Sequence, residues 1–207
     1  MATSTKLDLY KLHANEYAAP RTPTTINIGP ARYLTITGKG QPGGEAFTAR
    51  LGALYNVAFT VKMAKKFAGR DYAVCKLEGL WWGPRKQADF FQLPPAQWNW
   101  KLIIRTPDFI TEQDLQEAID SLLERAKPRD VADVKLEPLD EGLSVQMLHT
   151  GPYSRESETI SKMKSYAASE GLIVSGLHHE IYLSDPRRVA PERLRTILRY
   201  PVAKKKR

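Results

Sequence analysis

The chain has 207 residues, of which 42% are hydrophobic and 26% charged, and its formal net charge is +8. This composition excludes a disordered or fibrous chain and indicates one globular domain spanning residues 1–207. The apolar runs are far shorter than the roughly 20 residues that cross a bilayer, and we find no secretory signal. We therefore expect a cytoplasmic protein. A single cysteine, Cys75, excludes an intramolecular disulfide and a Cys-based zinc site.

The positive charge is concentrated at the C-terminus. Residues 186–207 contain nine Lys or Arg and one acidic residue, whereas residues 1–185 contain 22 of each sign. A DNA-binding domain usually spreads its basic residues along a patch or a groove-facing helix. We therefore expect no nucleic-acid partner, and we interpret residues 203–207 as a solvated basic tail.

Hydrophobic periodicity predicts the elements in chain order. Residues 1–25 carry Pro20 and Pro23 and are expected to wrap loosely over the body as a lead-in. A first module with a linking helix follows over residues 30–127, and the pattern restarts in a second module over residues 140–202. The first module is predicted to contain strands at 31–38, 72–82 and 97–105, helices at 45–66 and 111–126, and a loop at 85–96. The second module is predicted to contain strands at 143–149, 176–184 and 194–202, and a helix at 154–170 with Gly171 after its end.

The two halves can be aligned on a shared pattern. Glu78 aligns with Glu180, Pro84-Arg85 with Pro186-Arg187, and Lys86 with Arg188. The alignment predicts an α+β fold of two tandem strand–helix–strand–strand modules with pseudo-two-fold symmetry and antiparallel sheets. It also predicts that Glu78 superposes on Glu180. The seam between two such halves is a usual place for a ligand.

All four tryptophans fall within 20 residues, at positions 81, 82, 98 and 100. They form either a large aromatic core or a box in which indole faces stack on a flat ligand. Strand alternation places Trp98 and Trp100 on one face and places Trp81 and Trp82 on opposite faces. The sequence leaves open which member of the latter pair faces the ligand.

Two glutamates lie inside predicted strands. Glu180 shares a face with His178 and Tyr182, and Glu78 shares one with Leu80 and Trp82. Both carboxylates either face solvent or are buried, and a desolvated carboxylate suits a general base or a cation-binding group. Because His178 and the adjacent His179 point to opposite faces, we expect no metal site. No phosphate-binding, dinucleotide-binding or nucleophile-elbow motif is found, and we expect no cofactor.

From about residue 5 to residue 202 the chain resembles GyrI-like small-molecule-binding proteins. The motifs that carry the resemblance are Leu77-Glu78-Gly79-Leu80-Trp81-Trp82, Trp98-x-Trp100-Lys101-Leu102, 107–111, Gly151-Pro152-Tyr153 and, most specifically, 178–188. The family is similar to the effector-binding domains of multidrug-responsive transcription activators, which bind bulky cations with a buried glutamate. The resemblance places that glutamate at Glu180. This chain lacks DNA-binding helices, so the resemblance does not extend to direct control of transcription.

A stand-alone branch resembles this chain more closely and is known for hydrolysing cyclopropanoid genotoxins of the duocarmycin and yatakemycin type. The resemblance implies that Glu180 and Tyr153 are catalytic, and that no cofactor takes part. The expected ligand contacts are Trp82, Trp98, Trp100, Glu78, Tyr182, His178 and Tyr55. The expected partner is a flat aromatic small molecule. We expect no nucleic-acid or membrane partner, and the sequence leaves open whether the chain forms a homodimer. The alternative function is a non-catalytic module that sequesters or senses drugs. A third candidate function, inhibition of a topoisomerase, is supported by no motif in the sequence.

Overall fold

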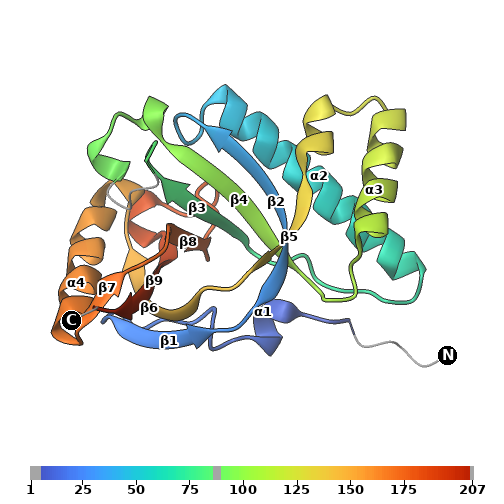
Figure 1. The fold of residues 1–207 in the computed structure, drawn as a ribbon. Helices are drawn as coiled ribbons and strands as arrows, with labels where there is room; N and C mark the ends of the chain where they lie inside the picture. Colours follow the sequence, from blue (N-terminus) through green and yellow to red (C-terminus); the bar gives the residue numbers. More distant parts are fainter. Residues whose placement is uncertain (1–5, 86–89, 206–207) are drawn as a thin grey trace.

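The computed structural model describes residues 6–85 and 90–205. These residues form an α+β fold, confirming the predicted class (Figure 1). The helices are α1 (Leu9–Leu12), α2 (Glu45–Phe67), α3 (Glu112–Glu124) and α4 (Glu156–Ser169). The strands are β1 (Thr24–Ile28), β2 (Ala31–Lys39), β3 (Leu77–Trp82), β4 (Asn99–Thr106), β5 (Lys135–Leu139), β6 (Gly142–Thr150), β7 (Leu172–Val174), β8 (His178–Tyr182) and β9 (Arg195–Lys204). No helix in these two ranges combines the length and apolar character needed to cross a bilayer.

One antiparallel sheet joins the two predicted modules. Its strand order is β1-β6-β9-β8-β3-β4-β2-β5, and β7 pairs with β9 beside this path. The first module contributes β2, α2, β3 and β4, and the second contributes β6, α4, β8 and β9. Their third elements, β3 and β8, pair at the centre of the sheet. The predicted pseudo-two-fold arrangement is therefore present, and its seam runs along the β3–β8 pair.

Both module helices cover the same face of the sheet. Paired residues of antiparallel strands point to one face, and the register aligns Leu102 of β4, Gly79 of β3, Glu180 of β8 and Leu198 of β9 in one row. At one end of this row, Leu102 belongs to the core cluster under α2, and at the other, Leu198 belongs to the cluster under α4. Figure 1 shows α2 and α3 beside one half of the sheet and α4 beside the other. Glu180 thus lies on the helix-covered face between two hydrophobic cores.

The register corrects the predicted superposition of Glu78 on Glu180. Glu78 pairs with Ile181, whereas Glu180 pairs with Gly79. Since successive strand residues alternate between faces, the two carboxylates lie on neighbouring strands but point to opposite faces. The alignment by residue type differs from the structural equivalence of the two strands by an odd number of residues. The aligned glutamates therefore point to opposite faces of the sheet. Lys86, which the alignment matches with Arg188, lies outside the described residues.

Two further expectations are corrected. Over residues 6–25 the lead-in is not loose, since Leu9 and Tyr17 are buried in the main core and β1 pairs with β6; residues 1–5 lie outside the described residues. The second predicted strand begins at Leu77 rather than Tyr72, because residues 72–76 run beside the N-terminal segment, where Tyr72 makes a single bridge to Leu7. The basic tail is exposed at residues 203–205, as expected for a solvated tail, although Ala203 and Lys204 pair with β7; residues 206–207 lie outside the described residues. The sequence prediction did not include α1, β1, β5 or β7.

Trp100 is a core residue that requires a glycine beside it. Its side chain has no solvent exposure, and its indole N–H donates to the Gly40 carbonyl at 3.2 Å. A Cβ at Gly38 would lie 2.1 Å from Cη2 of Trp100, which is closer than any real contact. Gly38 is therefore required by packing, because the indole occupies the space above its Cα.

We expect Gly38→Ala to lower the free energy of unfolding by about 1–3 kcal/mol or more, the scale of an overpacked core. Urea unfolding followed by tryptophan fluorescence measures this loss. Gly52→Ala on α2 is the matched control, since a Cβ there meets no atom within 4 Å and should stabilise the helix by about 0.4–1 kcal/mol. Equal stability of the Gly38 variant and the parent would contradict the packing argument.

Candidate functional site

Glu180 is held by residues of its own strand. Nε2 of His178 lies 3.1 Å from Oε1 of Glu180, and Tyr182 lies on the same face two residues later. Gly79, the cross-strand partner of Glu180, makes room for this arrangement because a Cβ there would approach Oη of Tyr182 to 3.0 Å. The Glu180 side chain remains 10% exposed, whereas that of His178 is 1% exposed. The Glu180 side chain is therefore not fully sealed from solvent.

The start of α4 supplies the other side of the site. The turn at Gly151-Pro152 leads into a short 3-10 helix at Tyr153–Arg155, and Glu156 is the first residue of α4. His149 on β6 fixes this turn: Nδ1 lies 2.9 Å from Oγ1 of Thr159, and Nε2 lies 3.2 Å from the Pro152 carbonyl. Tyr153 is 40% exposed, and its ring stands at 84° to that of Tyr182 with centroids 6.1 Å apart. The structure thus brings Tyr153, His178, Glu180 and Tyr182 together, as the sequence analysis proposed.

Glu156 is a site residue that the sequence analysis missed. Its side chain is buried beside Glu180. Burial and the negative charge of Glu180 raise the pKa of Glu156 well above its usual range. A signal was present in the sequence, because Tyr153 and Glu156 are three residues apart and such residues face the same side of a helical turn.

The tyrosines of the site are kept protonated. Burial, followed by the charge of Glu180, raises the pKa of Tyr153 to about 12. The same two causes raise the pKa of Tyr182 well above its usual range. Both hydroxyls are therefore hydrogen-bond donors beside an acidic pair. Tyr55 on α2 is half-buried. Burial raises the pKa of both Tyr55 and Tyr153, and the charge of Asp185 contributes to this rise.

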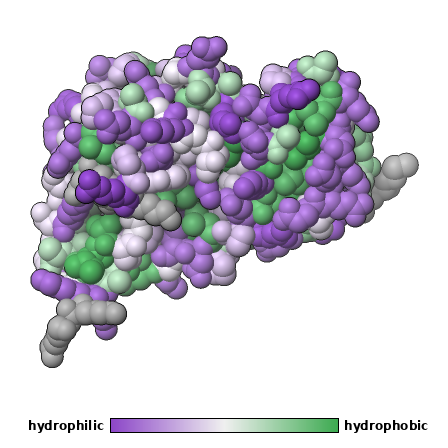
Figure 2. All heavy atoms as spheres, turned by 45° about the horizontal axis from the view of Figure 1, so that its top comes forward, coloured by the Kyte–Doolittle hydropathy of each residue, from purple (hydrophilic) through white to green (hydrophobic). Residues whose placement is uncertain are grey.

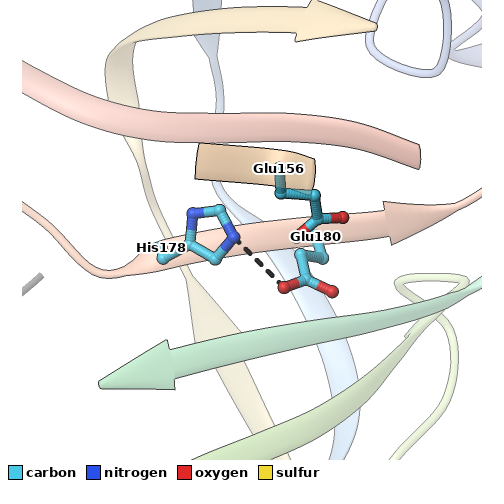
Figure 3. A group of neighbouring side chains, drawn as sticks. All are labelled: Glu156, His178 and Glu180. Atoms are coloured by element: carbon cyan, nitrogen blue, oxygen red, sulfur yellow. Dashed lines mark hydrogen bonds and ion pairs between the residues drawn. The ribbon is translucent and has the colours of Figure 1, made fainter. Parts of the chain in front are cut away.

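Three side chains converge in a way that could hold a cation (Figure 3). The ligand atoms of Glu156, His178 and Glu180 all lie within 4.8 Å of one another. The sequence analysis expected no metal site because it considered only His178 with His179, which do point to opposite faces. The third donor comes from a different element, α4, and only the fold brings it to β8.

The tryptophans are divided between the two faces and the core. Trp81 pairs with His178 and shares its face, whereas Trp82 points to the opposite face. Trp81 packs between Phe47 and Phe90, with ring centroids at 6.0 Å and 6.3 Å. Its indole N–H is buried without a hydrogen-bond partner among the described residues. Half-buried Trp98 meets the edge of Trp81 and donates to the Leu93 carbonyl. The aromatic cluster of this seam therefore contains Trp81 and Trp98, with Trp100 in the core behind it.

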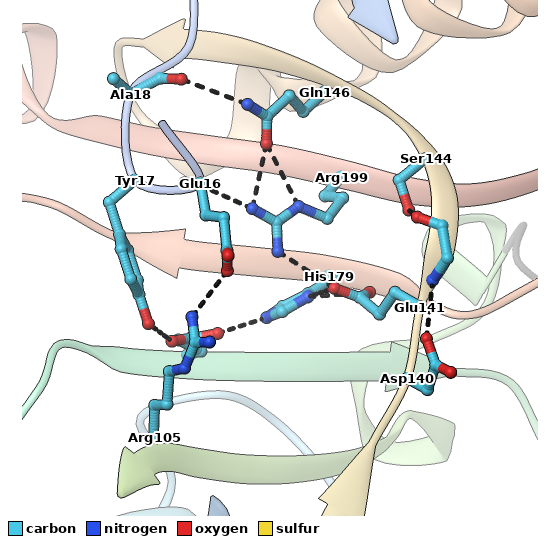
Figure 4. A network of polar contacts seen from close by, with 12 residues as sticks. Glu16, Tyr17, Ala18, Arg105, Asp140, Glu141, Ser144, Gln146, His179 and Arg199 are labelled. Carbon is cyan, nitrogen blue, oxygen red and sulfur yellow. Dashed lines mark hydrogen bonds and ion pairs between the residues drawn. The ribbon is translucent and has the colours of Figure 1, made fainter. Parts of the chain in front are cut away.

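On the opposite face, Glu78 belongs to a buried charge network (Figure 4). It accepts a hydrogen bond from the Tyr17 hydroxyl at 2.9 Å, and its other oxygen lies 2.9 Å from Nε2 of His179. Nδ1 of His179 lies 3.0 Å from Glu141, which also accepts from Nη1 of Arg199 at 3.0 Å. Glu78 therefore lies away from the residues around Glu180.

The network is balanced in charge and holds the N-terminal segment. Arg105 donates to Glu16 at 2.6 Å, and Arg199 donates to the Glu16 carbonyl at 2.6 Å. Burial alone would lower the pKa of His179, but Glu141 and Glu78 outweigh it and raise that pKa to about 9. The histidine is thus a cation, and the three cationic groups match three carboxylates. The arrangement is a structural clamp between residues 16–18 and the sheet.

Two hollows lie away from Glu180. One, of about 710 Å³, lies on the opposite face beside Trp82, Lys101 and Leu177. The other, of about 570 Å³, is a groove between α3 and β5. In the half of the molecule that carries these elements, Figure 2 shows a hydrophobic strip bordered by hydrophilic side chains. Trp82 therefore lines a different surface from the one that Glu180 faces.

Comparisons with known proteins agree with this geometry. The GyrI-like small molecule binding domain matches residues 106–203. An uncharacterized conserved protein from Listeria innocua is 38% identical, with a TM-score of 0.88 over 96% of this chain and 100% of that chain. A hydrolase from Listeria innocua is 37% identical, with a TM-score of 0.88 over the same shares. The EcmrR C-terminal domain is 10% identical, with a TM-score of 0.58 over 89% of this chain and 98% of that one, and it shows the fold alone. A search of curated proteins found no match.

The chain belongs to the GyrI-like family of small-molecule-binding proteins.

Proposed function

We propose that this protein binds flat aromatic small molecules in the seam along the β3–β8 pair, on the helix-covered face of the sheet, and hydrolyses cyclopropanoid ones. The observation that carries the proposal is the Glu180 carboxylate, which is buried between two hydrophobic cores yet still 10% exposed at its side chain. A carboxylate in such a place can accept a proton from a water molecule that approaches through the seam. The likeness to a hydrolase from Listeria innocua over nearly the whole chain supports a hydrolytic reaction.

The proposed reaction adds one water to a strained spirocyclopropane. The water oxygen attacks the CH₂ carbon of the three-membered ring, and Glu180 takes the proton. The carbon–carbon bond breaks, and its electron pair moves into the conjugated dienone, which becomes a phenolate. The proton taken by Glu180 then passes through solvent to the phenolate oxygen, which gives the phenol and restores the Glu180 carboxylate. Release of ring strain and gain of aromaticity drive this step. The Tyr153 hydroxyl and the unpartnered Trp81 N–H are donors suited to the developing phenolate oxygen.

The proposed ligand contacts differ in part from those expected from the sequence. Asp185 acts electrostatically on both Tyr55 and Tyr153, which supports a role for these two rings in flanking a flat ligand. Half-buried Trp98, with buried Trp81 behind it, supports an aromatic wall. Trp100 is enclosed in the core, and Trp82 and Glu78 point to the other face of the sheet. We therefore include Tyr55, Tyr153, His178, Glu180, Tyr182, Trp98 and Trp81 in the proposal and leave out Trp100, Trp82 and Glu78.

The proposal is tested by incubating the protein with a spirocyclopropane substrate and analysing the product by mass spectrometry. We expect time-dependent conversion to a product that has gained one water, at a rate proportional to protein concentration. A substrate that is bound but recovered unchanged would contradict hydrolysis. The proximity of Glu156 to Glu180 favours a second candidate function, a non-catalytic module for cationic drugs. Such a module would bind cationic dyes tightly and lose that affinity in Glu180→Gln.

A further inference from the structure

We propose that Glu156, His178 and Glu180 form a binding site for one first-row divalent metal ion of the zinc class. The three side chains come from two separated elements, the first turn of α4 and strand β8, and converge on one point (Figure 3). Their ligand atoms lie within 4.8 Å of one another. This inference goes beyond the proposed hydrolysis and does not depend on it.

The spacing of the donors suits a small ion. Zinc binds nitrogen and oxygen ligands at about 2.0–2.2 Å, which places neighbouring ligand atoms roughly 3–3.6 Å apart. Nε2 of His178 and Oε1 of Glu180 are already 3.1 Å apart. The Glu156 ligand atom lies within 4.8 Å of these two and must move closer by about 1 Å to complete the set. A set of three protein ligands matches the pattern of catalytic-type zinc sites, which keep one position open, rather than closed structural ones.

A buried oxygen at the site is available to a cation. Oε1 of Glu156 has no hydrogen-bond partner among the described residues, although the residue is only 7% exposed. Two carboxylates enclosed together are costly unless a proton or a cation neutralises them. An imidazole in the set favours transition metals over magnesium or calcium.

A second layer of contacts supports the ligands. The Tyr182 hydroxyl lies against Glu180, and Gly79 leaves the space that permits this contact. The buried His178 ring packs between Phe90 and Tyr200, with centroids at 5.6 Å and 4.9 Å. A hydrogen bond such as that of Tyr182 fixes the orientation of a metal ligand and tunes its affinity, whereas Nδ1 of His178 is buried without a hydrogen-bond partner among the described residues. An ion at this point would occupy the oxygen with which Glu180 accepts a proton, so zinc would inhibit the proposed hydrolysis.

The test titrates Zn²⁺ into chelator-treated protein by isothermal calorimetry, without any organic ligand, and repeats it with Co²⁺ under visible absorption. We expect one equivalent of metal ion to bind per chain. The Co²⁺ complex should show the absorption spectrum of a cobalt ion with a low coordination number. Glu156→Gln should weaken binding by about 100-fold or more, since even loss of an outer-shell partner costs 10–100-fold. Glu158→Gln is the matched control, because this carboxylate is exposed on the same helix and pairs with Arg155; it should bind as the parent does.

Two results would overturn the metal site. One is the absence of stoichiometric binding at millimolar Zn²⁺ or Co²⁺ by protein with a native circular dichroism spectrum. The other is equal affinity in Glu156→Gln and the parent. His178→Gln provides a second variant should Glu156→Gln not fold. Because the titration contains no cyclopropanoid, failure of the metal site is distinguishable from failure of the proposed hydrolysis.

Discussion

Glu180→Gln should bind a flat aromatic ligand with near-normal affinity and hydrolyse a spirocyclopropane about 10²–10⁴-fold more slowly, the usual contribution of a general base. The substitution keeps the size of the side chain and its contacts with His178 and Tyr182 but removes the group that accepts the proton. The measurement is single-turnover kinetics with product mass analysis, combined with ligand affinity from tryptophan fluorescence. A loss confined to the rate identifies an interaction made in the transition state.

Two companion variants sharpen this experiment. Tyr153→Phe should reduce the rate more than the affinity, because its hydroxyl faces the charged pair while its ring still flanks the ligand. Glu170→Gln, at the end of α4 and exposed, removes a carboxylate far from the seam and should leave both quantities unchanged. Should Glu180→Gln hydrolyse as fast as the parent, Glu180 is not the base. Should no cyclopropanoid be turned over while Glu180→Gln loses affinity for cationic dyes, the binding-module function replaces hydrolysis.

Glu141→Gln should lower the free energy of unfolding by about 3–5 kcal/mol at pH 6, the cost of breaking a buried ion pair from one side. The variant leaves Arg199, which is 2% exposed, and His179, which has no exposure, without their shared carboxylate. Urea unfolding of both proteins measures the difference. Glu137→Gln is the matched control, because its pair with Lys101 is partly exposed and such pairs contribute about 1 kcal/mol or less.

The same carboxylate predicts a pH dependence. Burial would raise the pKa of Glu141, but His179 and Arg199 lower it from 4.5 to about 2. A depressed pKa contributes stability that is present above the unfolded value and is lost as the pH falls through the folded value. The difference between the parent and Glu141→Gln should therefore shrink as the pH falls from about 4.5 toward 2. A difference that stays constant over this range would show that Glu141 is not held as a carboxylate by the network.

The sequence by itself determined the fold class, the module order and the residues centred on Glu180. Hydrophobic periodicity placed α2 at Glu45–Phe67 within one residue, because a long amphipathic helix repeats its pattern many times. The alternation of His178, Glu180 and Tyr182 predicted their shared face, since strand geometry fixes side-chain direction without reference to any partner. Motif 178–188 carried the family resemblance, and the family is shown by the whole-chain likeness to proteins of Listeria innocua.

Only the tertiary structure decided which residues from different elements meet. Cross-strand register is set by the pairing of β3 with β8, and it directs Glu78 to the N-terminal segment and Glu180 to the seam. Whether an indole is a ligand surface or core depends on its neighbours: Trp100 is enclosed because Gly38 leaves a space for it. Glu156 reaches Glu180 because α4 begins beside β8. The spacing from Tyr153 indicates only the side of the turn on which Glu156 lies, and not this contact. Local periodicity specifies the direction of a side chain, and long-range packing specifies what that side chain contacts.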